Sequence, residues 1–331
     1  MTTQNPKPPA TDLKTTMNAM VYERYGSPDV LELREIDKPV AEANEVLVRV
    51  HAAGIAAGDH HLLNADIFAV RLYQGLFGPK RNVLGHDFAG TVEAIGPDVT
   101  RFRVGDAVFG ESSEAGCFAE YVAVAEDHVV AKPDSLSFEQ ASAVPVSAIT
   151  ALQGMRDKGR VRAGQRVLVN GASGGVGQFA VQIAKSMGAH VTGVCSTGKV
   201  AMVRDLGADS VIDYHEADFT QRAERYDLVL DCVGNRPLAD CKRTLNPDGI
   251  YVAVAGAPMR SLRIAITGGK QAVVFIAKPN VPDLEVIREL IESGKVKPVL
   301  DRQFALRELP DAMRAFQGGQ AHGKLVISMQ S

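Results

Sequence analysis

The sequence predicts a two-domain α/β protein, with a barrel-like domain of short strands followed by a doubly wound parallel sheet. Up to about Val144, short apolar runs are separated by Gly, Pro and Asp, which is the pattern of strands joined by turns. After Pro145, single apolar strands alternate with helical stretches, as in a parallel sheet with right-handed crossovers. A length of 331 residues also exceeds what one hydrophobic core usually holds, so two domains are expected.

Short strands are expected throughout the first domain because its apolar runs are brief and bounded by turn residues. The expected strands are residues 19–22, 30–33, 45–52, 90–95, 107–109, 118–124 and 129–131. Residues 1–16, which precede them, hold three prolines and no apolar stretch. We therefore predict a disordered leader there and no secretory or transit signal.

Helices and strands alternate in the second domain. Apolar side chains at helical spacing from Val176 to Met187 predict a helix that ends at Gly188. The other elements expected are strands at 166–170, 191–195, 210–213, 228–233, 250–255 and 273–277, and helices at 199–206 and 237–245. Beyond Pro279 we expect helices at 283–293 and 309–317 and strands at 299–304 and 324–327. The pattern alone leaves open whether these last elements extend the sheet or return to the first domain.

Composition and charge exclude several classes of partner. A formal net charge of −3 gives no basic field to attract nucleic acid. No apolar run approaches the ~20 residues that cross a bilayer. The four cysteines form no C-x-x-C pair, which is typical of reduced, structural cysteine. We expect a cytoplasmic protein that binds a small molecule and neither nucleic acid nor membrane.

A glycine-rich turn after the strand at 166–170 predicts dinucleotide binding. Residues 167–177 read VLVNGASGGVG, in which Ala172, Gly174 and Gly177 have the spacing A-x-G-x-x-G. Small residues there permit a sharp turn, close approach of the backbone to a pyrophosphate, and tight packing of helix on strand. Free amides at the start of the helix then bind phosphate oxygens. The intervening residues of the expected binding turn are Ser173, Gly175 and Val176.

The residues after the second strand of this domain favour NADPH over NADH. An NAD site needs an acidic residue about 20 residues beyond the glycines, which accepts a hydrogen bond from the ribose 2′-hydroxyl. This sequence has Ser196, Thr197 and Lys199 there and no carboxylate. Two hydroxyls and an ammonium suit a 2′-phosphate instead. We therefore predict NADPH as the cofactor.

From about residue 18 to residue 327, the chain resembles the medium-chain dehydrogenase/reductase superfamily, and within it the zinc-independent NADPH:quinone oxidoreductase branch. The motifs that carry this resemblance, in the family's order, are GHDFAGTVEAIG at 85–96, VGDAVFG at 104–110, GCFAEYV at 116–122, AVPVSAITA at 143–151, GASGGVG at 171–177, GAD at 207–209, DCVG at 231–234 and HGKLVI at 322–327. The resemblance implies a Rossmann NADPH-binding domain at 145–279, inserted into a GroES-like catalytic domain made of residues 17–144 and 280–331. It also implies a homodimer, for which the edge strand 273–277 is the expected contact.

The resemblance assigns further residues to the cofactor. Thr150 matches a threonine near the nicotinamide ribose, and Lys324 matches a lysine near the cofactor. Ser196, Lys199 and Tyr214 match the set that binds the 2′-phosphate. The residues that match the wall of the nucleotide and nicotinamide site are Val233, Gly234, Ala255, Phe275 and Ile276.

The ligands of a catalytic zinc are missing from the positions to which the resemblance points. The zinc-dependent branch has a cysteine where this chain has Ala56 and a third ligand where it has Val146 and Ser147, so that His86 and Asp87 alone are kept. A catalytic zinc needs three protein ligands. Adjacent histidines on a strand or loop point in opposite directions, which also disfavours a displaced metal site, and we expect no metal. The displaced site would comprise Asp59, His60, His61, Asp87 and Glu111.

Without zinc, the hydride acceptor must already be electrophilic, as quinones and α,β-unsaturated carbonyl compounds are. The expected reaction is hydride transfer from the nicotinamide to such a compound, while protein groups stabilise the developing negative oxygen. Quinone reductases usually have an asparagine at the position of Ala56, followed by an aspartate that Asp59 matches. The apolar and aromatic stretch 68–77 is expected to line the acceptor pocket. The candidate catalytic residues are Asp59, His61, Tyr73, His86 and Tyr121.

Two other functions remain open at this point. One is a zinc-dependent alcohol dehydrogenase or carbonyl reductase, which Ala56 and Val146 disfavour. The other is a non-catalytic NADPH-binding protein, which the sequence alone does not distinguish from an enzyme.

Overall fold

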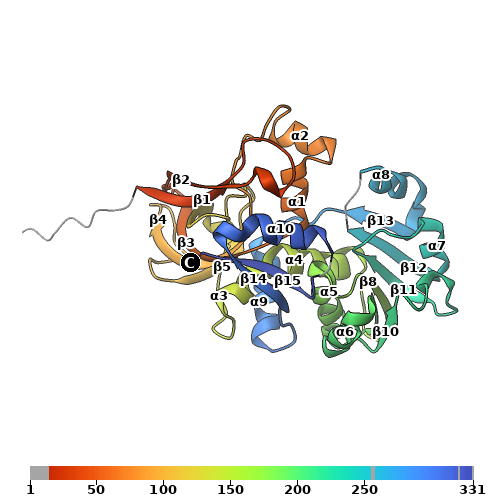
Figure 1. Cartoon of the computed structure of the whole chain (residues 1–331). Helices are drawn as coiled ribbons and strands as arrows, with labels where there is room; N and C mark the ends of the chain where they lie inside the picture. The colour runs from red at the N-terminus through yellow and green to blue at the C-terminus, as the bar shows by residue number, and fades with distance from the viewer. Residues whose placement is uncertain (1–14, 255–257, 320, 330–331) are drawn as a thin grey trace, which may run out of the picture.

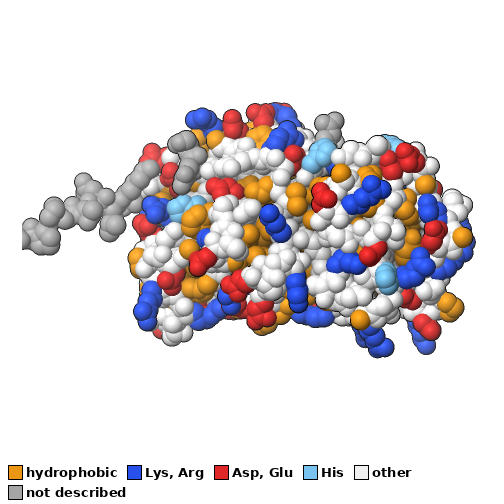
Figure 2. Space-filling model, turned by 90° about the horizontal axis from the view of Figure 1, so that it is seen from below, with side chains coloured by type: hydrophobic (Ala, Val, Ile, Leu, Met, Phe, Trp, Pro, Cys, Tyr) orange, Lys and Arg blue, Asp and Glu red, His pale blue; other side chains and the backbone are white. Residues whose placement is uncertain are grey.

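The computed structural model of the chain describes residues 15–254, 258–319 and 321–329, and its two large β-sheets lie at opposite ends of the molecule (Figure 1). The predicted leader 1–16 falls mostly outside these residues, and its last residue begins strand β1 (Thr16–Val21). Figure 2 shows basic and acidic side chains interspersed over one face of the molecule. Within the described residues, no helix has the length and apolar character needed to cross a membrane.

The sheet of the second domain contains six parallel strands in the order β10-β9-β8-β11-β12-β13. The first strand of this sheet, β8, lies in its middle. Strands β9 and β10 follow on one side of β8 and strands β11 to β13 on the other, so a crevice opens beside the carboxyl end of β8. The doubly wound parallel sheet predicted from the sequence is thereby confirmed. Its strands are β8 (Arg166–Asn170), β9 (His190–Cys195), β10 (Ser210–Asp213), β11 (Tyr226–Asp231), β12 (Leu245–Val254) and β13 (Ala272–Phe275).

Helices cover both faces of this sheet because successive side chains of each strand point to opposite faces. Val167 and Val169 of β8 pack in one cluster with α5 (Gly175–Ser186) and α6 (Val200–Asp205). Leu168 packs in another cluster with α7 (Leu238–Arg243) and α8 (Pro258–Thr267).

The sheet of the first domain has the strand order β14-β15-β3-β4-β5-β7, with β6 paired to β3. Strand β15 pairs antiparallel with β3, and β14 runs parallel to β15, so the C-terminal strands join the N-terminal sheet. Strands β1 and β2 form a separate antiparallel pair. The strands are β2 (Glu32–Asp37), β3 (Glu45–Gly54), β4 (Asp87–Ile95), β5 (Ala107–Glu111), β6 (Tyr121–Ala125), β7 (Val129–Ala131), β14 (Leu300–Ala305) and β15 (Lys324–Ser328).

Several short helices were not predicted, because a helix of one or two turns shows too few repeats of the apolar period. They are α1 (Ala57–Asn64), α2 (Phe68–Gln74), α3 (Phe138–Ser142), α4 (Pro145–Gln153) and α8. The remaining helices, α9 (Val281–Glu292) and α10 (Leu309–Gln317), lie where the sequence pattern predicted helices. Helix α1 matters for the site because it carries Asp59.

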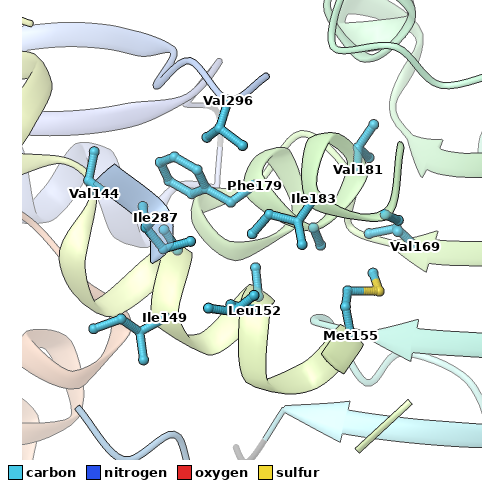
Figure 3. Packing of buried hydrophobic residues seen from close by; sticks show 14 of the residues in the cluster. Val144, Ile149, Leu152, Met155, Val169, Phe179, Val181, Ile183, Ile287 and Val296 are labelled. Atoms are coloured by element: carbon cyan, nitrogen blue, oxygen red, sulfur yellow. The ribbon is translucent and has the colours of Figure 1, made fainter. Parts of the chain in front are cut away.

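Helix α4 lies in the core that joins the two halves, and Figure 3 shows its packing. Ile149 and Leu152 of α4 are both about 1% exposed and belong to one cluster with Phe179 of α5 and Ile287 of α9. The same cluster contains Phe109 of the first sheet. Contacts with both halves of the molecule therefore fix the position of α4. The residues at the N-terminus of α4 are held in place with it.

Truncating Leu152 to alanine tests this packing. Leu152→Ala is expected to lower the free energy of unfolding by about 2–5 kcal/mol, because it removes buried methyl groups and leaves a cavity. Val40→Ala, at a side chain that is 83% exposed, is the matched control and is expected to change it by less than about 0.5 kcal/mol. Urea unfolding followed by circular dichroism measures both, and equal values for the two variants would contradict the packing described.

Candidate functional site

The glycine-rich turn lies between β8 and α5. Gly171 has φ of +85°, a left-handed conformation that glycine adopts readily. A Cβ atom on Gly177 would come within 2.0 Å of the carbonyl oxygen of Gly171, so this position requires glycine for the helix to pack on the turn. Gly174 is the N-cap of α5 and contributes no capping side chain. The first amides of α5 therefore remain available to bind an anion.

A cleft with a cavity volume of about 430 Å³ runs from this turn to the first domain. Both halves of the molecule line it. The predicted residues that line it are Ser173, Gly174, Gly175, Val176, Gly177, Ser196, Lys199, Tyr214, Val233 and Lys324. Sequence reasoning missed other lining residues, among them Ile55, Asn170, Asn235 and Phe316, because only the fold brings these distant segments together.

A second cavity, of about 640 Å³, adjoins the cleft at the end of β9. Ser196, Lys199 and Tyr214 line both cavities, so the three predicted phosphate-binding residues lie at one place. The Lys199 ammonium lies 3.4 Å from the carbonyl oxygen of Gly319, and burial lowers its pKa from the usual value. Further basic side chains line the second cavity, and sequence reasoning missed them: His215, Arg302 and His322.

Other residues predicted to bind the cofactor do not line the cleft. The Thr150 hydroxyl donates to the carbonyl oxygen of Val146, one turn back on α4, at 2.6 Å. Phe275 is buried in the core, whereas Ile276 is 79% exposed. Ala172 is buried beneath the turn, and Ala255 lies outside the described residues. Thr197 is exposed and hydrogen-bonds to Asp213. The amide of Gly234 donates a hydrogen bond to Asp231.

Asp59 organises a buried polar cluster beside the cleft. One of its oxygens accepts a hydrogen bond from the amide of Ala56 at 2.8 Å. The other oxygen lies 3.1 Å from the amide of Gly85 and 2.9 Å from Nδ1 of His86. Burial would lower the pKa of His86, but the hydrogen bond to Asp59 and the other carboxylates nearby outweigh it, so the pKa is raised. The hydrogen bond to Asp59 thereby holds the His86 ring in one orientation.

A buried lysine links this cluster to the cleft. The Lys324 ammonium lies 2.9 Å from the carbonyl oxygen of Ile55, 3.1 Å from the Ser147 hydroxyl and 3.4 Å from Asp87. A Cβ atom on Gly175 would lie 3.3 Å from the side chain of Lys324, so the lysine borders the glycine-rich turn directly. Burial raises the pKa of Asp87, and the nearby Lys324 charge partly offsets this effect.

None of the predicted catalytic residues is among the described residues that line the cleft: Asp59 and His86 belong to the cluster beside it, and Tyr73 and Tyr121 make contacts elsewhere. Tyr73 is 60% exposed, and its hydroxyl accepts a hydrogen bond from Arg81 at 2.7 Å. Tyr121 lies on β6, where the ammonium of Lys38 is 3.7 Å from its ring centroid. Helix α2 lies at the top of Figure 1, and Phe77, just beyond it, is fully exposed. The prediction that stretch 68–77 lines the pocket is therefore wrong, because its large apolar side chains are more than half exposed, namely Phe68, Leu72, Tyr73, Leu76 and Phe77.

The two adjacent histidines, His60 and His61, lie on helix α1. The expectation that they point in opposite directions assumed a strand or loop, and that assumption is wrong. Ligand atoms of His60, His61 and Asp66 lie within 4.8 Å of one another, and no other His, Cys, Asp and Glu side chains of the described residues form such a group. His61 pairs with Asp66 at 2.9 Å, and Nδ1 of His60 lies 2.9 Å from the Asn64 amide nitrogen. His61 is thus separate from the cleft and from His86.

Comparisons with known proteins agree with this architecture. Residues 42–134 match the family described as "Alcohol dehydrogenase GroES-like domain", and residues 206–327 match "Zinc-binding dehydrogenase". The chain is 32% identical to "NAD(P)H oxidoreductase RTN4IP1, mitochondrial" of Danio rerio, over 96% of this chain and 92% of that protein. It is 33% identical to "2-methylene-furan-3-one reductase" of Solanum lycopersicum, over 95% of this chain and 80% of that protein.

The solved structure of the quinone oxidoreductase from Coxiella burnetii superposes on this chain with a TM-score of 0.86 at 32% sequence identity, covering 95% of this chain and 100% of that one. This similarity extends over both large sheets and over the glycine-rich turn between β8 and α5. The chain belongs to the medium-chain dehydrogenase/reductase superfamily, in its quinone oxidoreductase-like branch.

Proposed function

We propose that this protein is an NADPH-dependent oxidoreductase that reduces a quinone or an α,β-unsaturated carbonyl compound without a catalytic zinc. The observation that carries the proposal is the composition of the cleft. One part of it has the free amides of α5 and the basic side chain of Lys199, and the other part has Ala56 and Ser147 at positions where the zinc-dependent branch has metal ligands.

The cleft fits a nicotinamide dinucleotide. The glycines at the start of α5 leave space for a pyrophosphate where side chains would otherwise lie, and the helix N-terminus attracts its charge. The end of β9 presents Ser196 and Lys199 to the adjoining cavity. Among the described residues that line this cavity, Asp301 is the one carboxylate, and it lies on β14. These features support NADPH as the form that binds.

The nicotinamide, when bound, supplies the hydride. Lys324 and Ser147 line the cleft next to the glycine-rich turn, and the hydrogen bond between them fixes the position of both side chains. His86, which Asp59 orients in the buried cluster, is the proton donor that we propose. The relatives' names support this reading, because 2-methylene-furan-3-one and quinones are acceptors that need no metal to become electrophilic.

The two rival functions have less support. A zinc alcohol dehydrogenase would need three ligands at the cleft, and Ala56 and Val146 provide none through their side chains. A non-catalytic NADPH-binding protein would not need the buried Asp59–His86 pair beside the cleft. We also propose a cytoplasmic location for the protein.

A homodimer joined along β13 is part of the proposal. Strand β13 lies at the edge of the six-stranded sheet, and Ile276 directly after it is 79% exposed. An exposed strand edge is able to pair with a second copy. Light scattering on the purified protein is expected to give twice the mass of the 35.4 kDa chain, and a monomer at micromolar concentration would contradict it.

Lys199→Ala tests the preference for NADPH. The variant is expected to bind NADPH about 10- to 100-fold more weakly, because it loses a charge-assisted hydrogen bond worth about 1.5–3 kcal/mol. Its affinity for NADH is expected to stay unchanged. Fluorescence titration measures both dissociation constants, with the exposed Lys295→Ala as the control. An equal loss of affinity for both cofactors in Lys199→Ala would argue against a phosphate contact.

Stopped-flow oxidation of bound NADPH tests the reaction itself. Mixing the NADPH-loaded protein with a panel of quinones and enones is expected to oxidise the cofactor with at least one of them, and not with saturated ketones. Treatment with a chelator is expected to leave the rates unchanged, and elemental analysis to find no stoichiometric zinc. Oxidation by no compound would favour the non-catalytic binder, and loss of rate on chelation would favour the zinc enzyme.

A further inference from the structure

The second cavity, which adjoins the cleft at the end of β9, takes its walls from both halves of the molecule. Ser196, Lys199 and Tyr214 come from the second sheet, just after β9 and β10. Arg302 on β14 and His322, shortly before β15, come from the C-terminal segment that joins the first sheet. The cofactor contact proposed above involves the second-sheet side alone. The side that Arg302 and His322 form therefore has no role yet.

Two contacts join the walls of this cavity. The Lys199 ammonium lies 3.4 Å from the carbonyl oxygen of Gly319, which belongs to the C-terminal segment. A Cβ atom on Gly198 would lie 3.7 Å from Cε1 of His322, so the imidazole packs against the backbone of the turn after β9. In a doubly wound sheet, the end of the second strand is where the ribose 2′ position of a bound dinucleotide is recognised. His322 therefore lies beside that position.

An irregularity in β14 sets the direction of Arg302. Leu300 and Arg302 pair with neighbouring residues of β15, so Asp301 is an extra residue between them. Adjacent side chains of a regular strand point to opposite faces, and an extra residue of this kind re-aims the side chains beside it. Asp301 and Arg302 both line the cavity in consequence. The two strands approach closely at Gly323, where a Cβ atom would lie 2.5 Å from the carbonyl oxygen of Val299.

The charges of the cavity favour an anion. Its described lining residues include two cations, Lys199 and Arg302, and one carboxylate, Asp301. Nε of Arg302 lies 3.4 Å from the Asp301 carboxylate, while its two terminal nitrogens have no hydrogen bond to the described residues. A guanidinium presents such nitrogens as a fork that matches the oxygens of a phosphate. The imidazoles of His215 and His322 add two further polar groups.

We propose that Arg302 and His322 are specificity-determining residues, which bind the 2′-phosphate of NADPH together with Lys199. The inference rests on the proposed function and extends it, because it makes recognition of the phosphate depend on both halves of the molecule. NADH has a hydroxyl group at this position and offers the guanidinium no charge to bind. His322 stands two residues before Lys324, which borders the glycine-rich turn. One short segment of the first sheet therefore reaches two separate parts of the cofactor site.

Arg302→Gln tests the assignment with two probes that differ only in the 2′-phosphate, adenosine 2′,5′-bisphosphate and adenosine 5′-monophosphate. The wild type is expected to bind the bisphosphate more tightly than the monophosphate. Arg302→Gln is expected to bind the bisphosphate about 10- to 100-fold more weakly than the wild type does, because it loses charge-assisted hydrogen bonds. Its affinity for the monophosphate is expected to stay unchanged. Isothermal titration calorimetry measures these dissociation constants.

Arg307→Gln is the matched control, because Arg307 is also an exposed arginine of the C-terminal segment but does not line the cavity. It is expected to change neither dissociation constant. His322→Ala is expected to weaken binding of the bisphosphate alone, by about 2- to 10-fold, the scale of one neutral hydrogen bond. Arg302 and Lys199 share one phosphate in this arrangement. The loss in the double variant Arg302→Gln/Lys199→Ala is therefore expected to differ from the product of the two separate losses.

Each outcome decides the inference. If Arg302→Gln keeps the full preference of the wild type for the bisphosphate, the inference is overturned, while the NADPH preference in the proposed function stands. An equal loss of affinity for both probes also overturns it, because a general effect of charge or folding would act on both. Unchanged binding in His322→Ala overturns the part assigned to His322. If the wild type binds both probes equally well, the NADPH preference itself fails and the inference fails with it.

Discussion

A lysine ammonium that is almost fully buried needs partners, since an unpaired charge in a protein interior costs several kcal/mol, a large part of the net stability of a domain. Lys324 is 3% exposed, and its partners come from three separate segments: Ile55 at the end of β3, Asp87 at the start of β4, and Ser147 on α4. These contacts hold the last strand, the first sheet and the helix between the halves in one arrangement. The glycine-rich turn packs against the same lysine. The geometry of the cleft therefore depends on this one charge being satisfied.

The ionisable groups near Lys324 form pairs of opposite charge. Asp59 and Asp87 are the carboxylates, and His86 and Lys324 are the cations paired with them. A fifth group, Glu111, lies near these charges, and burial raises its pKa to about 8.

The features that the sequence predicted well are those that local physics determines. Strand β8, the turn with Gly171 and Gly177, and helix α5 follow from neighbouring residues alone, because the turn needs glycine and the helix needs its apolar period. The contact of Ser147 with Lys324 joins residues 177 positions apart, and no local pattern predicts it. Tyr73 was misjudged for a related reason: the apolar and aromatic side chains of its short helix predict burial, yet Tyr73 is 60% exposed. His60 and His61 were assigned to a strand or loop because α1 is too short to show a helical period.

The return of β15 to β3 also orders events during synthesis. Strands β8 to β13, with the glycine-rich turn, are contiguous in the chain and can assemble once they have left the ribosome. The end of β3, from Ala52 to Gly54, has its antiparallel partner in Val326 to Ser328, so its edge stays unpaired until the final strand has been made. An open strand edge is prone to mispairing with other chains. The nascent protein is therefore most exposed to aggregation in the interval between completion of its second sheet and arrival of its last strand.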